Sequence, residues 1–206
     1  RAISEQARIM GRLIGRLMDI SRLEAGTYEL DVRSVPTEEL VSGVVRSFRV
    51  LAERAGVALD TDVRPSAPER FHADGDLLRD DVLGNLVSNA LNHTPEGGTV
   101  TVRVRGEGDD VVFEVSDTGP GIPPEERRHV FDRYYQVERA GKGGSGLGLA
   151  VAREMAEAHG GRIELDPDPA PGATFRVVLP AEGGRVREPT IHRSSAVPRP
   201  STEGPR

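Results

Sequence analysis

The sequence predicts a mixed α/β domain that follows one long helix. Strand and helix periodicities alternate between residues 27 and 180, whereas residues 1–26 carry a seven-residue apolar repeat. Residues 181–206 contain four prolines and few apolar side chains, a composition typical of disorder. We therefore divide the chain into a helical segment over 1–26, an α/β domain over 27–180 and a tail over 181–206.

Composition excludes several classes of function. The chain has 206 residues, enough for one good core, and its net charge of −6 argues against nucleic acid or an anionic membrane as the main partner. It has no cysteine, which excludes disulfides and thiolate metal sites. No apolar run approaches the ~20 residues that a membrane-spanning helix needs. We expect a cytoplasmic domain, whether or not its parent protein is membrane-anchored.

The N-terminal segment is predicted to be a helix with a coiled-coil stripe. Ile3, Met10 and Leu17 repeat every seven residues, the pattern of a coiled coil or a helical bundle. A single helix cannot bury this stripe, so it needs either a partner helix or the surface of its own domain. Gly26 suits the position just after the end of such a helix.

The elements of the α/β domain follow in alternation. Strands are predicted over 28–35, 57–63, 99–105, 111–116, 162–166 and 173–179. Helices are predicted over 37–55, 76–93, 123–132 and 147–159, with Thr37 capping the first and Pro123 opening the third. The two strands over 99–105 and 111–116 are expected to form a hairpin.

The helix predicted over 76–93 has an unusual polar face. Asp81, Asn85, Asn89 and Asn92 recur at spacings of four, four and three residues, opposite an apolar stripe. Three asparagines cost ~2 kcal/mol of helix propensity relative to alanine, so an ordinary solvated face would use other residues. Amide oxygens in a row suit hydrated Mg²⁺ and phosphate oxygens. The alternative is an accidental polar face.

An acidic loop follows the second strand of the predicted hairpin. Asp117 precedes Gly119, Pro120 and Gly121, which keep the backbone out of helix and strand. A carboxylate there can accept from the exocyclic amine of adenine, which guanine does not present. Thr174 is available as a second polar contact, and the alternative for Asp117 is a simple turn-forming acid.

A glycine-rich segment over 141–148 precedes the helix predicted over 147–159. Glycine lets backbone amides approach a ligand, and a helix N-terminus attracts anions. The segment is not a Walker A loop, because Lys142 is followed by glycine. It is not a dinucleotide fingerprint either, because no strand precedes it. Together with the acidic loop, it predicts an ATP site.

These motifs resemble the catalytic, ATP-binding domain of bacterial sensor histidine kinases, in the GHKL superfamily. The matching blocks are 85–94 (N box), 117–122 (G1), 131–135 (F box), 144–149 (G2) and 172–175. Residues 21–26 also resemble the end of the second dimerisation helix. The resemblance implies a two-layer sandwich, a mixed β-sheet with helices on one face, with ATP under a lid between the F and G2 boxes.

The resemblance also implies roles for particular residues. Asn89, with Asn85 beside it, would hold Mg²⁺, Asp117 would bind adenine, and amides near Gly146 and Gly148 would bind phosphates. The expected ATP-binding set is Asn85, Asn89, Asn92, His93, Asp117, Gly119, Gly121, Ile122, Arg133, Tyr134, Lys142, Gly144, Ser145, Gly146, Leu147, Gly148 and Thr174.

Two departures from the family pattern concern phosphate charge. The family often has a basic residue where this chain has Asn92, and an arginine where it has Gln136. Arg133, Arg139 or Lys142 could supply the missing positive charge.

The phosphate acceptor expected from the resemblance is missing. No histidine of the chain stands in a His-Glu-x-x-Thr-Pro context, and the chain begins at Arg1 rather than Met. We therefore expect the acceptor outside this chain, on a histidine-bearing dimerisation domain of the same parent protein or of a separate one. The other expected partners are a response regulator receiver domain and a second copy of the parent, through the N-terminal helix.

Three alternatives stay open at this point. A hydrolytic ATPase of the gyrase type, or a related serine kinase, would need an acid where this chain has Asn85, because an amide cannot take a proton from water. A regulatory module that binds ATP without phosphotransfer is the third, and Asn92 and Gln136 favour it.

Overall fold

The computed structural model describes residues 29–135, 146–167 and 171–183. Its main sheet has five strands, ordered β2 (Ala58–Val63), β4 (Thr99–Glu107), β5 (Asp110–Asp117), β7 (Thr174–Pro180) and β6 (Arg162–Leu165). The first two pair in parallel and the other neighbours are antiparallel, so the sheet is mixed. The predicted hairpin is confirmed in β4 and β5.

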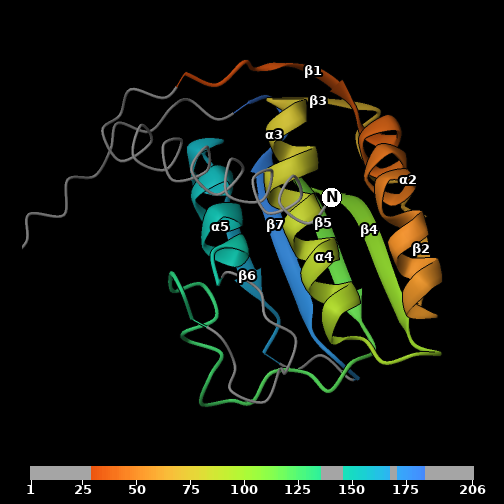
Figure 1. Ribbon diagram of the computed structural model, residues 1–206. Helices are drawn as coiled ribbons and strands as arrows, with labels where there is room; N and C mark the ends of the chain where they lie inside the picture. Colours follow the sequence, from red (N-terminus) through yellow and green to blue (C-terminus); the bar gives the residue numbers. More distant parts are fainter. Residues whose placement is uncertain (1–28, 136–145, 168–170, 184–206) are drawn as a thin grey trace, which may run out of the picture.

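A layer of helices covers one face of this sheet (Figure 1). It consists of α2 (Thr37–Ala55), α3 (Gly75–Leu77), η1 (Leu78–Leu83), α4 (Gly84–His93) and α5 (Gly148–Ala158). The two-layer sandwich is therefore confirmed. No helix of the described part is long and apolar enough to span a bilayer.

The core forms between the two layers because the strands alternate. On β4, Val100, Val102 and Val104 are buried, and the residues between them are partly exposed. The helices supply the matching stripe, including Leu86 and Val87, which are fully buried. Burial of such side chains contributes roughly 1.5–3 kcal/mol each, which holds the helices on this face.

The helix predicted over 76–93 is one continuous helix with an irregular middle. Between α3 and α4, residues Leu78–Leu83 wind as a π-helix. The Gly84 N–H donates to the carbonyl of Arg79, five residues earlier. A side chain at Gly84 would bring a Cβ within 2.9 Å of that carbonyl oxygen, so glycine permits the close turn.

The predicted cap of α2 is wrong, although its bounds are confirmed. Pro36 occupies the capping position, and Thr37 is buried inside the first turn. Its hydroxyl donates to the carbonyl of Pro68 instead of capping the helix. Glu38 and Glu39 in the first turn complement the positive end of the helix dipole.

Three further expectations differ from the structure. The strand predicted over 28–35 begins only at Arg33 in the described residues. A four-residue strand, β3 (Arg70–Ala73), was not predicted, and it pairs with β1 (Arg33–Pro36) in a small second sheet. Residues 123–132 are successive turns rather than a helix, closed by N–H···O bonds three residues apart. Arg127 contributes to this, because its side chain donates to the carbonyls of Ile122 and Pro167.

The α/β domain continues past the predicted boundary at 180, and its description ends at Gly183. The Ala181 N–H donates to the Asp109 carbonyl, and the Ala181 carbonyl accepts from the His72 N–H. The predicted helix over 1–26 and the tail after Gly183 lie outside the described residues.

Candidate functional site

Asn85 is held in one orientation by its own helix. Its side-chain Nδ2 donates to the carbonyl of Asp81, one turn earlier, at the end of the π-helical stretch. Because the amide nitrogen is engaged in this way, Oδ1 is the side-chain atom left to meet a ligand.

The start of α5 lies directly against this amide. A Cβ on Gly148 would stand 3.4 Å from Asn85 Oδ1, so the glycine backbone and the amide oxygen are neighbours. Leu147, just before the helix, is buried and fixes this end of α5 in the core. The structure therefore brings Asn85 and Gly148, the last glycine of the glycine-rich segment, together.

Asp117 ends β5 and is buried, with 6% of its surface exposed. Its Oδ1 accepts from the Gly119 N–H at 2.8 Å and from the Ala173 N–H at 3.3 Å. Within the described part of the chain, these are the hydrogen bonds of this carboxylate, and both use the same oxygen. The turn-forming role and the ligand-binding role are therefore compatible, because Oδ2 is left for a ligand.

Glycines bring the loop of Asp117 close to the end of α4. A Cβ at Gly119 would lie 2.6 Å from the carbonyl oxygen of His93, so the loop touches the last residue of the asparagine helix. Gly172 has a φ of +95°, and a Cβ there would overlap the Asp117 carbonyl. Both contacts require glycine, and they close the loop around the carboxylate.

Burial raises the pKa of Asp117 above its usual value. The N–H groups of Gly119 and Ala173 and the nearby His93 act in the opposite direction but do not offset the loss of water. A carboxylate with only backbone donors in a desolvated position is suited to accept a hydrogen bond from a neutral ligand group.

The remaining residues of the asparagine helix differ in exposure. Asn89 is half-buried, whereas Asn92 and His93 are exposed at the end of the helix. Gly121 has a φ of +73° and Ile122 packs partly against the core, so the loop after Asp117 turns back onto the domain.

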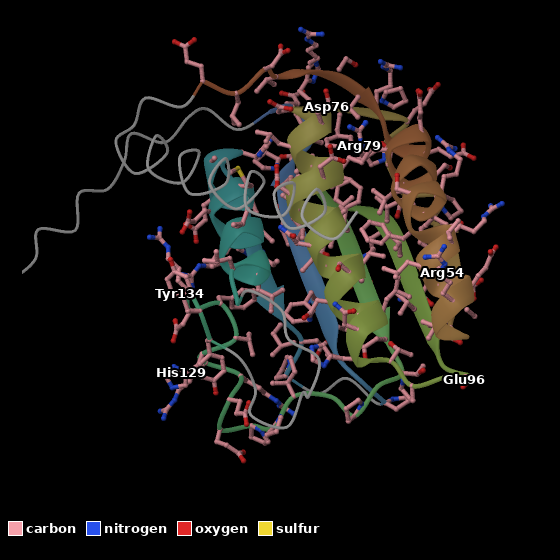
Figure 2. All side chains as sticks on the ribbon, viewed as in Figure 1. Arg54, Asp76, Arg79, Glu96, His129 and Tyr134 are labelled. Carbon is pink, nitrogen blue, oxygen red and sulfur yellow. The ribbon has the colours of Figure 1, made fainter. Side chains whose placement is uncertain are left out.

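Arg133 and Tyr134 precede the predicted lid. Arg133 pairs with Glu154 on α5, with Nη2 and Oε1 2.7 Å apart. Tyr134 is 64% exposed and lies at the periphery of the molecule (Figure 2). Its N–H donates to the Gly146 carbonyl, and both residues have a φ of +66°. Lys142, Gly144 and Ser145, like Gln136 and Arg139, lie outside the described residues.

Thr174 is not brought to the Asp117 side chain. Its hydroxyl donates to Ser116 Oγ at 3.0 Å, and Ser116 is opposite it in the β5–β7 register. Because successive strand residues face opposite sides of a sheet, this pair lies on the face away from Asp117 and the helices. The hydroxyl of Thr174 suggests this residue from the sequence, whereas the contact to Asp117 comes from the Ala173 N–H, a backbone group that the residue type does not indicate.

The fold and this grouping of residues define an ATPase-type domain with an acidic loop, a polar helix face and a glycine-lined helix start. The family model "Histidine kinase-, DNA gyrase B-, and HSP90-like ATPase" matches residues 74–183. This span is more than half of the chain, so the chain belongs to that family. Several relatives carry the name of histidine kinases.

Three of these relatives show the extent of the likeness. The circadian input-output histidine kinase CikA of Synechococcus elongatus is 36% identical over 186 residues, covering 88% of this chain and 24% of CikA. The crystal structure of full-length ShkA in complex with AMPPNP matches with a TM-score of 0.78 and 29% identity, over 89% of this chain and 38% of ShkA. The mycobacterial sensor histidine kinase MprB matches with a TM-score of 0.61 and 31% identity, over 74% of this chain and 99% of that structure.

The chain thus corresponds to the ATPase domain of sensor histidine kinases. It spans about a quarter of CikA and less than half of SenX3 from Mycobacterium tuberculosis, to which it is 34% identical.

Proposed function

We propose that the chain binds Mg·ATP and presents the γ-phosphoryl group to a histidine outside this chain. The observation that carries this proposal is the meeting of Asn85 Oδ1 with the Gly148 backbone, in the same helix that reaches the Asp117 loop at His93. An ATP molecule has an adenine at one end and phosphates at the other, and these two contacts offer a matching group at each end.

Asp117 is the proposed adenine contact. Its Oδ1 is engaged by two backbone N–H groups, so Oδ2 accepts from the exocyclic amine of adenine. Guanine carries a carbonyl at the corresponding position and would place two acceptors together. This chemistry selects ATP over GTP.

The phosphate end is proposed to lie between Asn85 and the start of α5. Backbone N–H groups at the N-terminus of α5, near Gly146 and Gly148, donate to phosphate oxygens, and the helix dipole favours their charge. Mg²⁺ prefers hard oxygen ligands and keeps several waters, which fits the amide oxygens of Asn85 and Asn89. The metal would neutralise phosphate charge.

Phosphotransfer is proposed to rest on positioning and charge stabilisation. A nitrogen of the acceptor imidazole forms the new N–P bond while the bond from the γ-phosphorus to the β-phosphate oxygen breaks, and ADP leaves. The proposed acceptor belongs to a helical dimerisation domain, and the proposed downstream partner is a receiver domain. Asn85 cannot act as a base, which disfavours attack by water.

Labelled ATP tests this proposal directly. The chain is incubated with γ-labelled ATP, Mg²⁺ and a purified histidine-bearing dimerisation domain from a sensor kinase. We expect a labelled protein that is acid-labile and base-stable, as a phosphohistidine is. The matched control is the dimerisation domain with its histidine replaced by glutamine, which should stay unlabelled.

ATP binding without any label would overturn phosphotransfer and support the regulatory module. Release of labelled inorganic phosphate without labelled protein would instead support a hydrolytic ATPase.

A further inference from the structure

His159 is a buried residue at the end of α5 that the proposed ATP contacts do not use. Only 6% of its surface is exposed. Its Nε2 accepts from the Asp74 N–H at 3.1 Å, and its Nδ1 donates to the Met155 carbonyl at 2.7 Å. Because a backbone N–H can only donate and a carbonyl can only accept, these partners fix a single neutral tautomer.

The Asp74 contact joins two helices that run in opposite directions. Asp74 caps α3, the first turn of the helix that continues to Asn85, while His159 ends α5, which begins at Gly148. Asn85 lies eleven positions after Asp74, and His159 lies eleven positions after Gly148. The two helices lie side by side (Figure 1), so one end of the pair is joined at His159 and the other meets at Gly148.

Asp74 makes two further hydrogen bonds through its carboxylate. Oδ1 accepts from the Leu77 N–H at 3.2 Å, which caps α3, and Oδ2 accepts from the Asp31 N–H at 3.1 Å. The backbone around Asp74 is therefore fixed on both sides. His159 accepts from the N–H of this fixed residue, so its ring is held in a defined position.

We propose that His159 is a positioning residue for the phosphate half of the nucleotide site. Its bond to the Asp74 N–H fixes the position of α5 along the continuous helix made of α3, η1 and α4. It thereby sets the distance between the Gly148 backbone and Asn85 Oδ1. The Asp117 half of the site lies on β5 and its loop and does not depend on this bond. This inference rests on the proposed function, which places the phosphates between Asn85 and Gly148.

Two substitutions separate the two hydrogen bonds of the ring. His159→Asn places an amide nitrogen near the position of Nδ1, so donation to Met155 is kept and the bond to Asp74 is lost. His159→Gln places an amide oxygen near the position of Nε2, so the bond to Asp74 is kept. The test compares the affinities of the full 206-residue chain for Mg·ATP and for adenosine, which lacks phosphates, by calorimetry.

We expect His159→Asn to weaken ATP binding by about fivefold, the typical effect of one lost hydrogen bond, and to leave adenosine binding unchanged. His159→Gln should restore ATP affinity to within about twofold of the parent chain. Equal losses for ATP and adenosine, or no loss for either, would overturn the proposal. Glu114→Gln is the control for general destabilisation, because Glu114 lies on the other face of the sheet and should affect neither affinity.

A measurement on the unsubstituted chain keeps the test decisive if His159→Asn does not fold. Coupling between two sites is reciprocal, so ATP should shift the ring-nitrogen NMR resonances of His159 and adenosine should not. His159 ring-nitrogen resonances that do not shift when ATP is added would contradict the positioning role. Failure of the proposed phosphate site between Asn85 and Gly148 has a different signature, because the unsubstituted chain would then bind ATP no more tightly than adenosine.

Discussion

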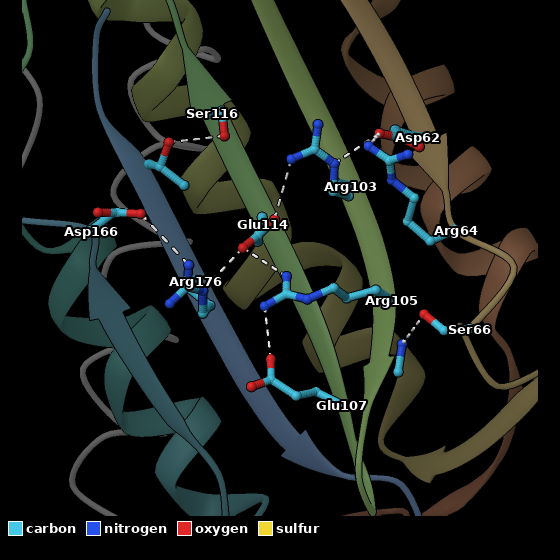
Figure 3. Close-up of polar contacts among 12 residues, drawn as sticks. Asp62, Arg64, Ser66, Arg103, Arg105, Glu107, Glu114, Ser116, Asp166 and Arg176 are labelled. Atoms are coloured by element: carbon cyan, nitrogen blue, oxygen red, sulfur yellow. Dashed lines mark hydrogen bonds and ion pairs between the residues drawn. The ribbon is translucent and has the colours of Figure 1, made fainter. Parts of the chain in front are cut away.

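Two buried carboxylates lie three residues apart on β5 and face opposite sides of the sheet. Asp117 faces the helices, and its described hydrogen bonds come from backbone N–H groups. Glu114 faces the open side and contacts Arg103, Arg105 and Arg176 (Figure 3). Burial raises the pKa of Asp117, whereas the pKa of Glu114 is lowered because its arginines outweigh the effect of burial.

The two faces of the sheet differ in how the charge of their buried carboxylate is balanced. On the open face, the arginines around Glu114 also pair with Asp62, Glu107 and Asp166, so charges are balanced across neighbouring strands. On the covered face, the carboxylate of Asp117 has no described cation within salt-bridge distance and costs free energy until a ligand arrives. One strand therefore carries an acid that is paired with arginines and an acid that we propose binds adenine, and substitutions should separate the two roles.

The largest expected effect is on nucleotide affinity. Asp117→Asn replaces the acceptor by an amide and removes a hydrogen bond to a charged group, so we expect ATP affinity to fall about 10- to 100-fold. The same change should leave the unliganded fold intact and slightly more stable, because an ionised buried carboxylate is removed. Calorimetry and thermal melting measure the two effects. Unchanged ATP affinity would count against the adenine assignment.

The next effect is on stability. Glu114→Gln leaves three arginines without their shared acid, and we expect a loss of about 1–2 kcal/mol in the free energy of unfolding, reduced by solvent around the partly exposed guanidinium groups. ATP affinity should not change. Urea unfolding checks the first statement. A variant as stable as the parent chain would show that the cluster does not contribute to stability.

Glu114 and Asp117 should also have opposite effects on stability as the pH falls. The pKa of Glu114 is lower in the folded state, so its contribution to stability is present above about pH 4.3 and is lost as the pH falls through the folded pKa. The pKa of Asp117 is higher in the folded state, so its penalty is relieved as the pH falls. Unfolding between pH 3 and 7 should therefore show a shallower acid loss for Glu114→Gln and a steeper one for Asp117→Asn.

The smallest expected effect concerns Thr174. Thr174→Val removes the hydroxyl bonded to Ser116 on the open face, so stability should fall by about 1 kcal/mol while ATP affinity changes less than twofold. Melting and calorimetry separate the two. A tenfold loss of affinity would place the hydroxyl in the nucleotide site after all.

The contrast between the faces also explains what the sequence could and could not predict. Alternation and helical periodicity are local, so β4, β5, α2 and α5 were predicted within a few residues. β3 was missed because four residues between Pro68 and Asp74 give too short a pattern, even though Phe71 and Ala73 are buried. The turns over 123–132 depend on Arg127 bonding to Ile122 and Pro167, which are contacts that periodicity does not encode.

The candidate site could likewise be predicted only in part from the sequence. Residue types revealed Asp117, the asparagines and the glycines, because each is unusual in its local setting. The side-chain bond from Asn85 to Asp81, the Ala173 N–H and the role of His159 depend on backbone geometry and on partners far along the chain. The residue types alone do not indicate those contacts.

The hydrogen bond between the Tyr134 N–H and the Gly146 carbonyl bears on how the domain tolerates a change in the length of the chain between them. It holds the two ends of the intervening stretch of chain together, so a change in the length of that stretch need not move the rest of the fold. Doubling the length of that stretch would cost only about 0.6 kcal/mol in closure entropy. A change in the length of this stretch should therefore leave the sheet and its core intact, because its entropic cost is small beside the burial that holds them.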